Sequence, residues 1–210
     1  MAPRPTLTRE RAAWADQLLL LGVDEVGRGP LAGPVVAAAV VFPLGCAALR
    51  GLRDSKLLPR AMREKLAARV LTRALAFGVG AASSREIDRL NIRVATALAM
   101  RRAIARAIRR GPLPAHRILI DGLPLPEVGY AHDALVDGDA LCHSVAAAGV
   151  LAKTVRDLLM RRLARRYPGY GWETNVGYGT PDHHAGLLER GPTCHHRRTF
   201  APIAQFTFSL

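Results

Sequence analysis

Apolar residues along the chain fall into short continuous runs, separated by longer stretches in which they recur every three or four positions. The runs at 18–25, 35–42, 77–82 and 117–121 end in polar, glycine-rich or proline-rich segments, as strands buried in a sheet do. No internal repeat and no long low-complexity linker separates them. The pattern predicts four strands of one sheet.

Helical spacing characterises three stretches, 60–76, 84–110 and 141–166. The third is apolar on most of its faces, which predicts a largely buried helix. The segment 167–184 is rich in glycine and aromatic residues and is predicted to be a loop, followed by a short helix at 185–190. Strands interleaved with helices predict an α/β layer architecture.

Basic residues outnumber acidic ones, with 30 Lys and Arg against 17 Asp and Glu and a formal net charge of +13. A field of this sign attracts polyanions such as nucleic acid and acidic membrane surfaces. Only three of the basic residues are lysine, so a compositional bias toward arginine explains the excess as well as function does. The predicted helix at 84–110 carries four arginines on one face, interpreted as solvated, with a nucleic-acid contact as the alternative: Arg102, Arg106, Arg109 and Arg110.

A hydrophobic fraction of 50% over 210 residues suffices for one sizeable core and excludes general disorder. The three cysteines are far apart and form no CxxC pair, which disfavours a disulfide scaffold and a zinc finger. No apolar run approaches the ~20 residues of a membrane span, and the first residues do not resemble a signal peptide. We therefore expect a cytoplasmic protein without a membrane partner. Since nothing in the sequence indicates oligomerisation, we expect a monomer.

Acidic residues end two of the predicted strands: Asp24 and Glu25 end the first, and Asp121 ends the fourth. Ligands of α/β proteins bind at the carboxyl ends of strands. Adjacent residues of a regular strand point to opposite faces, so Glu25 joins Asp24 only if the backbone turns there. Asp139 precedes the long helix, where it is either a catalytic acid or a helix N-cap, a role for which Asp137 competes.

Carboxylates that converge in a cleft repel one another unless cations lie between them. Mg²⁺ and Mn²⁺ prefer such oxygen ligands. Two of these ions, roughly 3.5–4 Å apart, activate a water and stabilise the leaving oxygen in phosphodiester cleavage. A basic protein with an acidic pocket therefore fits a nuclease.

Several motifs give a more specific indication, because together and in this order they resemble the bacterial type 2 ribonuclease H (ribonuclease HII) family. The resemblance runs from about residue 20 to residue 203. It rests on GVDEVGRGPLAGPVVAAAVVF at 22–42, LRDSKLL at 52–58, LIDG at 119–122, GDA at 138–140, SVAAAGVLAKTVRD at 144–157, YPGYG at 167–171, GYGTPDHH at 177–184 and HRRTFAPI at 196–203.

The resemblance implies a ribonuclease H-like fold, with a mixed five-stranded sheet flanked by helices and a helical C-terminal region. It places this domain at residues 18–204, between an N-terminal extension at 1–17 and a tail at 205–210. Family members hydrolyse the RNA strand of RNA–DNA hybrids and nick 5′ of single ribonucleotides embedded in duplex DNA, leaving a 5′-phosphate. These nucleic acids are the implied partners, and two Mn²⁺ or Mg²⁺ ions are the implied cofactors.

The family's functional residues carry over to particular positions. Its four catalytic, metal-binding acids fall on Asp24, Glu25, Asp121 and Asp139. The segment Gly27-Arg28-Gly29 matches the loop whose backbone reads the 2′-hydroxyl, and glycines let a backbone approach a ribose closely. Tyr178 matches the tyrosine that packs on the sugar at the RNA–DNA junction; taken without the resemblance, it reads as a loop tyrosine.

Two of the three lysines lie in matched motifs. Lys56 is assigned to a phosphate contact, whereas Lys153 on the buried helix is either a site residue or structural. Gly149 stands where the family usually has a serine, and family lysines are missing at two other places, which puts the strength of substrate binding in question. Four histidines in two adjacent pairs are interpreted as exposed loop residues rather than a zinc site: His183, His184, His195 and His196.

Two rival functions remain. A junction-resolving endonuclease also clusters acids on such a sheet, but it has no use for the ribose-reading loop. A non-catalytic nucleic-acid-binding protein would gain nothing from four clustered acids, which destabilise a fold without metal. The tail at 205–210, with Phe206, Phe208 and Leu210 alternating, either folds back as core or docks on a sliding clamp as an extended peptide.

Overall fold

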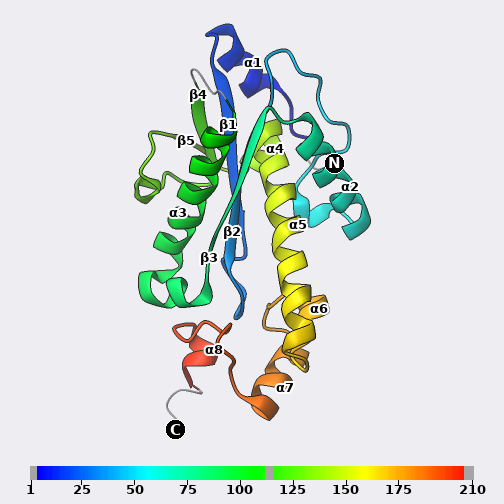
Figure 1. Cartoon of the computed structure of the whole chain (residues 1–210), viewed down its shortest axis with the longest axis vertical. Helices are drawn as coiled ribbons and strands as arrows, with labels where there is room; N and C mark the ends of the chain where they lie inside the picture. The colour runs from blue at the N-terminus through cyan, green and yellow to red at the C-terminus, as the bar shows by residue number, and fades with distance from the viewer. Residues whose placement is uncertain (1–3, 112–115, 206–210) are drawn as a thin grey trace.

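A computed structural model describes residues 4–111 and 116–205, which form a five-stranded mixed sheet between two layers of helices (Figure 1). The strand order is β3-β2-β1-β4-β5. β1 pairs antiparallel with β2 and parallel with β4, and the outer pairs are β2–β3 antiparallel and β4–β5 parallel. The strands are β1 (Leu19–Val26), β2 (Val35–Val41), β3 (Ala76–Ala82), β4 (His116–Asp121) and β5 (Asp133–Leu135).

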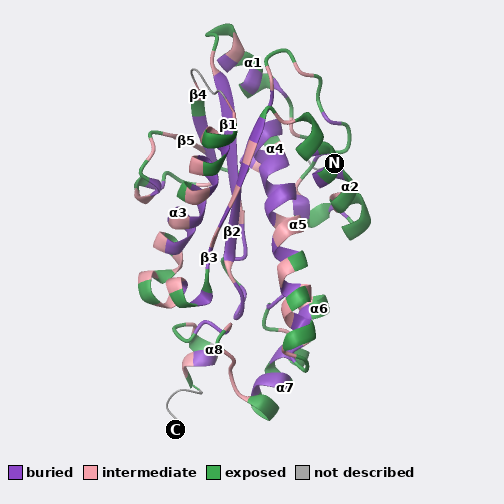
Figure 2. Cartoon of the chain, viewed as in Figure 1, coloured by how far each residue is buried: buried purple, intermediate pink, exposed green. Residues whose placement is uncertain are grey.

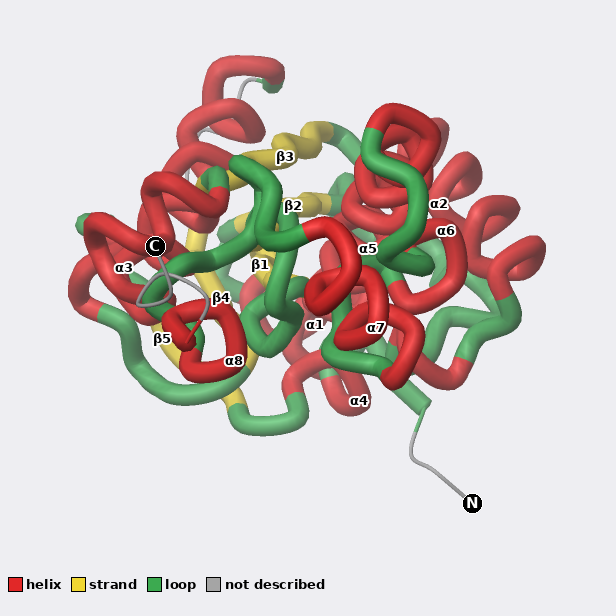
Figure 3. The backbone as a smooth tube through the Cα atoms, turned by 90° about the horizontal axis from the view of Figure 1, so that it is seen from below, coloured by secondary structure: helices red, strands yellow, loops and turns green. Residues whose placement is uncertain are grey.

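Helices cover both faces of the sheet, with α3 on one side and α5 and α2 on the other, as the view along the sheet shows (Figure 3). The helices are α1 (Thr8–Ala15), α2 (Arg60–Arg73), α3 (Ser84–Arg110), α4 (Gly138–Leu141), α5 (His143–Arg166), α6 (Trp172–Asn175), α7 (Pro181–Arg190) and α8 (Ala201–Ala204). Two 3₁₀ turns, η1 (Ser55–Leu57) and η2 (Pro126–Val128), lie in the loops. In the described part, no helix is long and apolar enough to span a bilayer.

The alternation of side chains along β1 divides the core into two layers. Leu21 and Val23 face α3, whereas Gly22, between them, faces α5 so closely that a Cβ there would lie 2.4 Å from the backbone of Ser144. All seven residues of β2 are buried, because that central strand is covered on both faces (Figure 2). The close approach of α5 to β1 brings the helix to the acids at the strand's end.

The arginine face of α3 has a function that the sequence did not reveal. Arg102 Nη1 donates to the carbonyl of Ala81 at 2.7 Å, and Arg106 Nη1 donates to that of Val79. The guanidinium of Arg110 lies 4.6 Å from the ring centroid of Phe77. These three side chains therefore contact β3, the edge strand, although Arg106 and Arg110 remain exposed, so this face is solvated and also has a structural role.

The periodicity predicted β1–β4, α2, α3, α5 and the end of α7, but it missed the shorter elements α1, β5, α4, α6 and α8. The missed helix α1 holds the N-terminus of α5. Glu10 is 1% exposed and accepts hydrogen bonds from the Ser144 backbone N–H at 2.7 Å and from its hydroxyl at 2.8 Å. Glu10 thus supplies the cap that the first residues of α5 lack.

Candidate active site

Asp24 and Glu25 lie at the carboxyl end of β1, which stays regular through Val26. They therefore point to opposite faces without the turn considered from the sequence. Asp24 is 6% exposed and lies against α5, whereas Glu25 lines a pocket with Thr96 and Met100 of α3. Asp121 at the end of the parallel strand β4 lines the same pocket as Glu25.

Asp139 belongs to the short helix α4, not to the start of the long helix α5. The N-cap position of α4 is taken by Asp137, in left-handed backbone with φ 55° and with no capping bond from its side chain. Asp139 therefore caps neither helix. Asp121 Oδ1 accepts a 2.7 Å hydrogen bond from the backbone N–H of Gly138, which ties α4 to the end of β4.

The four acids, called here the acid cluster (Asp24, Glu25, Asp121 and Asp139), are electrostatically strained. Burial, and then repulsion from Glu25, Asp121 and Asp139, raise the pKa of Asp24 well above its usual value. Burial, and then Asp121 and Asp54, raise the pKa of Asp139 to about 6. Burial is also the main cause that raises the pKa of Glu25 and of Asp121.

The donor set of the acid cluster fits hard divalent cations, because all four side chains are carboxylates and their charges disfavour one another. Within residues 4–111 and 116–205, no three acid, histidine or cysteine side chains converge on one point closely enough to enclose an ion. The cluster is thus open, with its carboxylates supplied by β1, β4 and α4.

Gly149 makes room for Asp24. A Cβ at position 149 would lie 2.2 Å from Asp24 Oδ2, so any side chain there would displace the carboxylate. The glycine that departs from the family pattern therefore has a local consequence beyond the ~0.5–1 kcal/mol it costs a helix relative to alanine.

Lys56 is exposed on η1 and belongs to the same electrostatic neighbourhood. Burial lowers its pKa, but Asp54, Asp139, Asp24 and Asp121 outweigh this, so that the pKa of Lys56 is raised overall. Asp54 is a site neighbour that sequence reasoning missed. Its carboxylate accepts a hydrogen bond from the Lys56 backbone N–H at 2.9 Å and also acts on Asp139.

Gly27, Arg28 and Gly29 follow the acid cluster directly and meet Tyr178. Gly27 has φ 91°, a conformation that favours glycine. A Cβ on Gly29 would lie 3.9 Å from Tyr178 Cε1, so the loop and the tyrosine ring are neighbours, and the ring is 43% exposed. Arg28 reaches back toward Glu25, with 3.4 Å between Nη1 and Oε1.

Two buried arginines fix this loop, and sequence reasoning did not single them out. Arg197 donates to the carbonyls of Gly27, Arg28 and Gly33 at 2.5–3.1 Å. Arg156 donates to three further carbonyls at 2.9–3.1 Å, those of Ala32, Pro34 and Val176. Both guanidiniums are 0% exposed. The loop 27–34, the segment 176–180 and these two arginines are called the recognition corner below.

The carbonyls of this loop are paired with the buried arginines, whereas its first N–H groups have no partner in the described part of the protein. Within the described residues, the backbone N–H groups of Gly27, Arg28 and Gly29 make no hydrogen bond to the protein. Burial, and then the charge of Arg156, lower the pKa of Arg197 to about 9, so it stays protonated at pH 7. At the exposed residues Arg28 and Gly29, the recognition corner thus has unpaired N–H donors close to positive charge.

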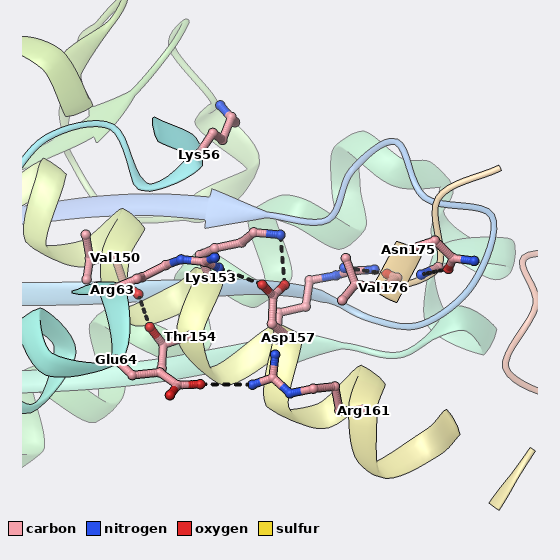
Figure 4. A network of polar contacts seen from close by, with 12 residues as sticks. Lys56, Arg63, Glu64, Val150, Lys153, Thr154, Asp157, Arg161, Asn175 and Val176 are labelled. Atoms are coloured by element: carbon pink, nitrogen blue, oxygen red, sulfur yellow. Dashed lines mark hydrogen bonds and ion pairs between the residues drawn. The ribbon is translucent and has the colours of Figure 1, made fainter. Parts of the chain in front are cut away.

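A basic cleft lies beside Tyr178, between α2, α5 and α6, with lining residues Lys56, Arg60, Arg63, Lys153, Asp157, Arg161, Glu173, Thr174, Val176 and Tyr178. Figure 4 shows Asp157 between Lys153 and Arg63, with Oδ1 2.8 Å from Lys153 Nζ and Oδ2 2.6 Å from Arg63 Nη1. Lys153 therefore has a structural partner and also lines the cleft, so both roles considered for it are compatible.

The interpretation of the histidines as exposed is wrong for two of them. His183 is 0% and His196 1% exposed, and their Nε2 atoms are 3.0 Å apart. His184 is exposed and His195 half-buried. No zinc site forms from histidine, cysteine or acid side chains in the described part of the chain.

Comparisons with known proteins agree with this arrangement. Residues 21–203 match the family described as Ribonuclease HII. The chain is similar to the ribonuclease HII of Synechococcus sp., with 52% identity over 95% of this chain and 90% of the relative. It superposes with a TM-score of 0.70 and 25% identity on ribonuclease HII of Archaeoglobus fulgidus, solved in complex with PCNA, covering 87% of this chain and 95% of that one. A Bst ribonuclease HIII solved with Mn²⁺ shares the fold, with a TM-score of 0.68 and 21% identity over 91% of this chain and 70% of the other.

Proposed function

The chain belongs to the ribonuclease HII family and is therefore a ribonuclease H endonuclease, and we propose that it also nicks duplex DNA 5′ of single embedded ribonucleotides. We further propose that it does so with two Mn²⁺ or Mg²⁺ ions held by Asp24, Glu25, Asp121 and Asp139. The observation that carries the proposal is the acid cluster, whose mutual repulsion a pair of cations relieves.

In this mechanism the acids hold the ions and the protein orients the strand. When bound, the ions supply an activated water and stabilise the leaving oxygen. Asp121 is oriented by the backbone N–H of Gly138, and Asp24 by the Glu25 N–H at 2.6 Å from its Oδ1. The Mn²⁺ bound by the HIII relative of the same fold supports a divalent cation here.

Recognition of the ribose is proposed for Gly27, Arg28, Gly29 and Tyr178. The unpaired N–H groups of the loop suit a 2′-hydroxyl or phosphate acceptor, and the exposed ring beside Gly29 suits a sugar. Lys56, between the acid cluster and the basic cleft, is proposed to contact a phosphate. Together these contacts explain how cleavage is confined to positions that carry a ribose.

The decisive experiment is a nicking assay on a duplex with one ribonucleotide, with and without Mn²⁺ or Mg²⁺, against an all-DNA duplex of the same sequence. We expect a metal-dependent nick 5′ of the ribonucleotide and none in the control. Cleavage of four-way junctions instead would favour a resolving endonuclease. Binding without any cut would favour a non-catalytic protein.

Tyr178→Ala tests the recognition part of the proposal. Stacking on an aromatic ring is worth ~1–3 kcal/mol, so nicking at a single ribonucleotide should fall roughly tenfold to a hundredfold. Binding of the duplex should weaken far less, because charge dominates it. Equal nicking by the two proteins would show that the tyrosine is only structural.

A second proposed contact is with a sliding clamp through the tail at 205–210. Residues 206–210 lie outside the described residues, so the structure does not test this interpretation. The PCNA complex of the archaeal relative supports it. Deleting residues 205–210 should abolish clamp binding and leave nicking and Tm unchanged; a lower Tm would instead show that the tail is part of the core. No binding of full-length protein at tens of micromolar clamp would refute the contact.

A further inference from the structure

We propose that His183 is a positioning residue, which fixes the backbone of Tyr178 and so holds its ring against the ribose-reading loop. The inference rests on the proposed role of Tyr178 and adds a residue to it. His183 touches neither the acid cluster nor the loop 27–29. It acts through a hydrogen bond between its Nδ1 and the Tyr178 carbonyl, 2.9 Å apart.

Tyr178 needs support from outside its own segment. It stands between Gly177, with φ 92°, and Gly179, and glycines give a backbone little stiffness of its own. The Tyr178 N–H donates to the Asn175 carbonyl at 3.0 Å, and its carbonyl accepts from the Thr180 N–H at 2.8 Å. Asn175 ends the four-residue helix α6 and Thr180 is the N-cap of α7, so both bonds join Tyr178 to near neighbours in the chain. The bond from the His183 side chain adds an anchor inside α7, the longer of these two helices.

The hydrogen bonds around His183 determine where its proton lies. Trp172 Nε1 can only donate, and it lies 3.1 Å from His183 Nε2, which must therefore be an acceptor. The proton of a neutral ring is then on Nδ1, from which it is donated to the Tyr178 carbonyl. The tautomer that anchors Tyr178 is thus selected by Trp172.

A second histidine completes the same assignment. His196 Nε2 lies 3.0 Å from His183 Nε2 and, because that nitrogen carries no proton, acts as a donor there, so that it shares the single lone pair of His183 Nε2 with Trp172 Nε1. His196 Nδ1 is then an acceptor, and the Thr193 backbone N–H donates to it at 2.8 Å. One set of neutral tautomers is compatible with all these contacts, with Trp172 and His196 sharing the lone pair of His183 Nε2; His183 and Trp172 are 0% exposed. The network is therefore rigid, and Tyr178 takes its position from it.

Two substitutions of His183 separate anchoring from packing. Asn places an amide N–H where Nδ1 was and keeps a donor for the Tyr178 carbonyl. Gln places its amide at the position of Nε2. It therefore keeps an acceptor for Trp172 but has no donor for the Tyr178 carbonyl. Both remove the ring, so Tm should fall by similar amounts in the two variants. The readouts are kcat/KM for nicking at a single ribonucleotide, the Kd of the same duplex measured without divalent cation, and Tm.

We expect His183→Gln to lower kcat/KM about tenfold with little change in Kd, because a small misplacement of a positioning contact affects the reaction more than attraction of the strand. His183→Asn should keep most of the wild-type value. In a Tyr178→Ala background, His183→Gln should have no further effect on kcat/KM.

Equal losses of activity in the Asn and Gln variants, or additive losses with Tyr178→Ala, would overturn the inference and leave His183 a packing residue. A wild-type protein that does not nick at single ribonucleotides would refute the proposed function instead. A wild-type protein that nicks, and loses activity with Tyr178→Ala but not with His183→Gln, would refute the inference alone.

Discussion

The acid cluster and the recognition corner adjoin each other at the end of β1, yet their charged groups are treated in opposite ways. In the acid cluster, burial and like charges raise the pKa of all four carboxylates. In the recognition corner, Arg156 and Arg197 are more deeply buried than these acids, but each donates to several carbonyls. The charges of the first region are uncompensated within the protein, whereas those of the second are matched by carbonyl acceptors.

The difference follows from the role proposed for each region. A site that must bind and release cations keeps its carboxylates unneutralised, which costs stability in the free protein. A site that discriminates one hydroxyl gains from rigidity, since free donors must already point at the ribose when the strand arrives. The following changes test this contrast, from the largest expected effect to the smallest.

Asp121→Asn should abolish catalysis while the fold survives. A neutral amide holds two cations poorly, and loss of several kcal/mol of charge stabilisation corresponds to about a thousandfold or more in kcat. Binding of an RNA–DNA hybrid should stay near the wild-type value, because the basic residues attract the strand. Rates and affinities in Mg²⁺ check both expectations. Near-normal turnover would contradict the assignment of Asp121.

Arg197→Met should strongly destabilise the protein, because it leaves the carbonyls of Gly27, Arg28 and Gly33 buried without donors. A loss of about 3–5 kcal/mol in the free energy of unfolding is expected, measured by urea denaturation. Arg198→Met at the exposed neighbouring position is the matched control and should change it by less than ~0.5 kcal/mol. Equal effects would show that the buried clamp is not a stabilising element.

Stability should fall in acid through the buried histidines. Burial, and then the neighbouring His183, lower the pKa of His196 to about 3, whereas the unfolded chain has a pKa near 6.5. The stability from its neutral form is complete above pH 6.5 and is lost as pH falls toward 3, at about 1.4 kcal/mol per unit. The acid cluster changes the stability in the opposite direction. Because its pKa values are raised in the folded protein, the folded state gains stability as pH falls and the carboxylates take up protons.

The two contributions separate in a comparison of wild type with His196→Gln. The difference between their unfolding free energies should shrink by about 2–3 kcal/mol between pH 7 and pH 4.5. Parallel pH profiles would mean that the histidine titrates equally in the folded and unfolded states.

Asp139→Asn should stabilise the metal-free protein, because it removes one charge from a repelling group. The side chain is only half-buried, so solvent screening limits the gain to about 1 kcal/mol, or roughly 2–4 °C in Tm. Asp133→Asn, at an exposed position of β5, should leave Tm unchanged. With saturating Mn²⁺, the wild type should instead have a higher Tm than Asp139→Asn, since only the wild type binds the ions well. A lower Tm without metal would contradict the claim of strain.

Asp24, Glu25 and Asp121 could be singled out from the sequence because a strand that ends in a carboxylate is a local pattern, whereas Asp139 was assigned from the family resemblance. The sheet and its long helices followed from periodicity for the same reason. Asp54 and the partners of Arg156, Arg197 and His183 could not be found in this way. Their roles depend on carbonyls and rings more than a hundred residues away or in irregular segments, where no period specifies contact. Within HRRTFAPI, the buried Arg197 and the exposed Arg198 are adjacent, and nothing in the sequence distinguishes one from the other.

The arginines of α3 that cover β3 also affect the tendency of the protein to aggregate. An uncovered edge strand is a template on which another chain can add a strand, and β3 is apolar enough to invite this. Arg102 and Arg106 occupy the carbonyls of Ala81 and Val79 that such a strand would need. These two arginines thereby protect the edge strand against pairing with another chain. The number of basic residues in the sequence therefore overestimates the number that are available to bind nucleic acid.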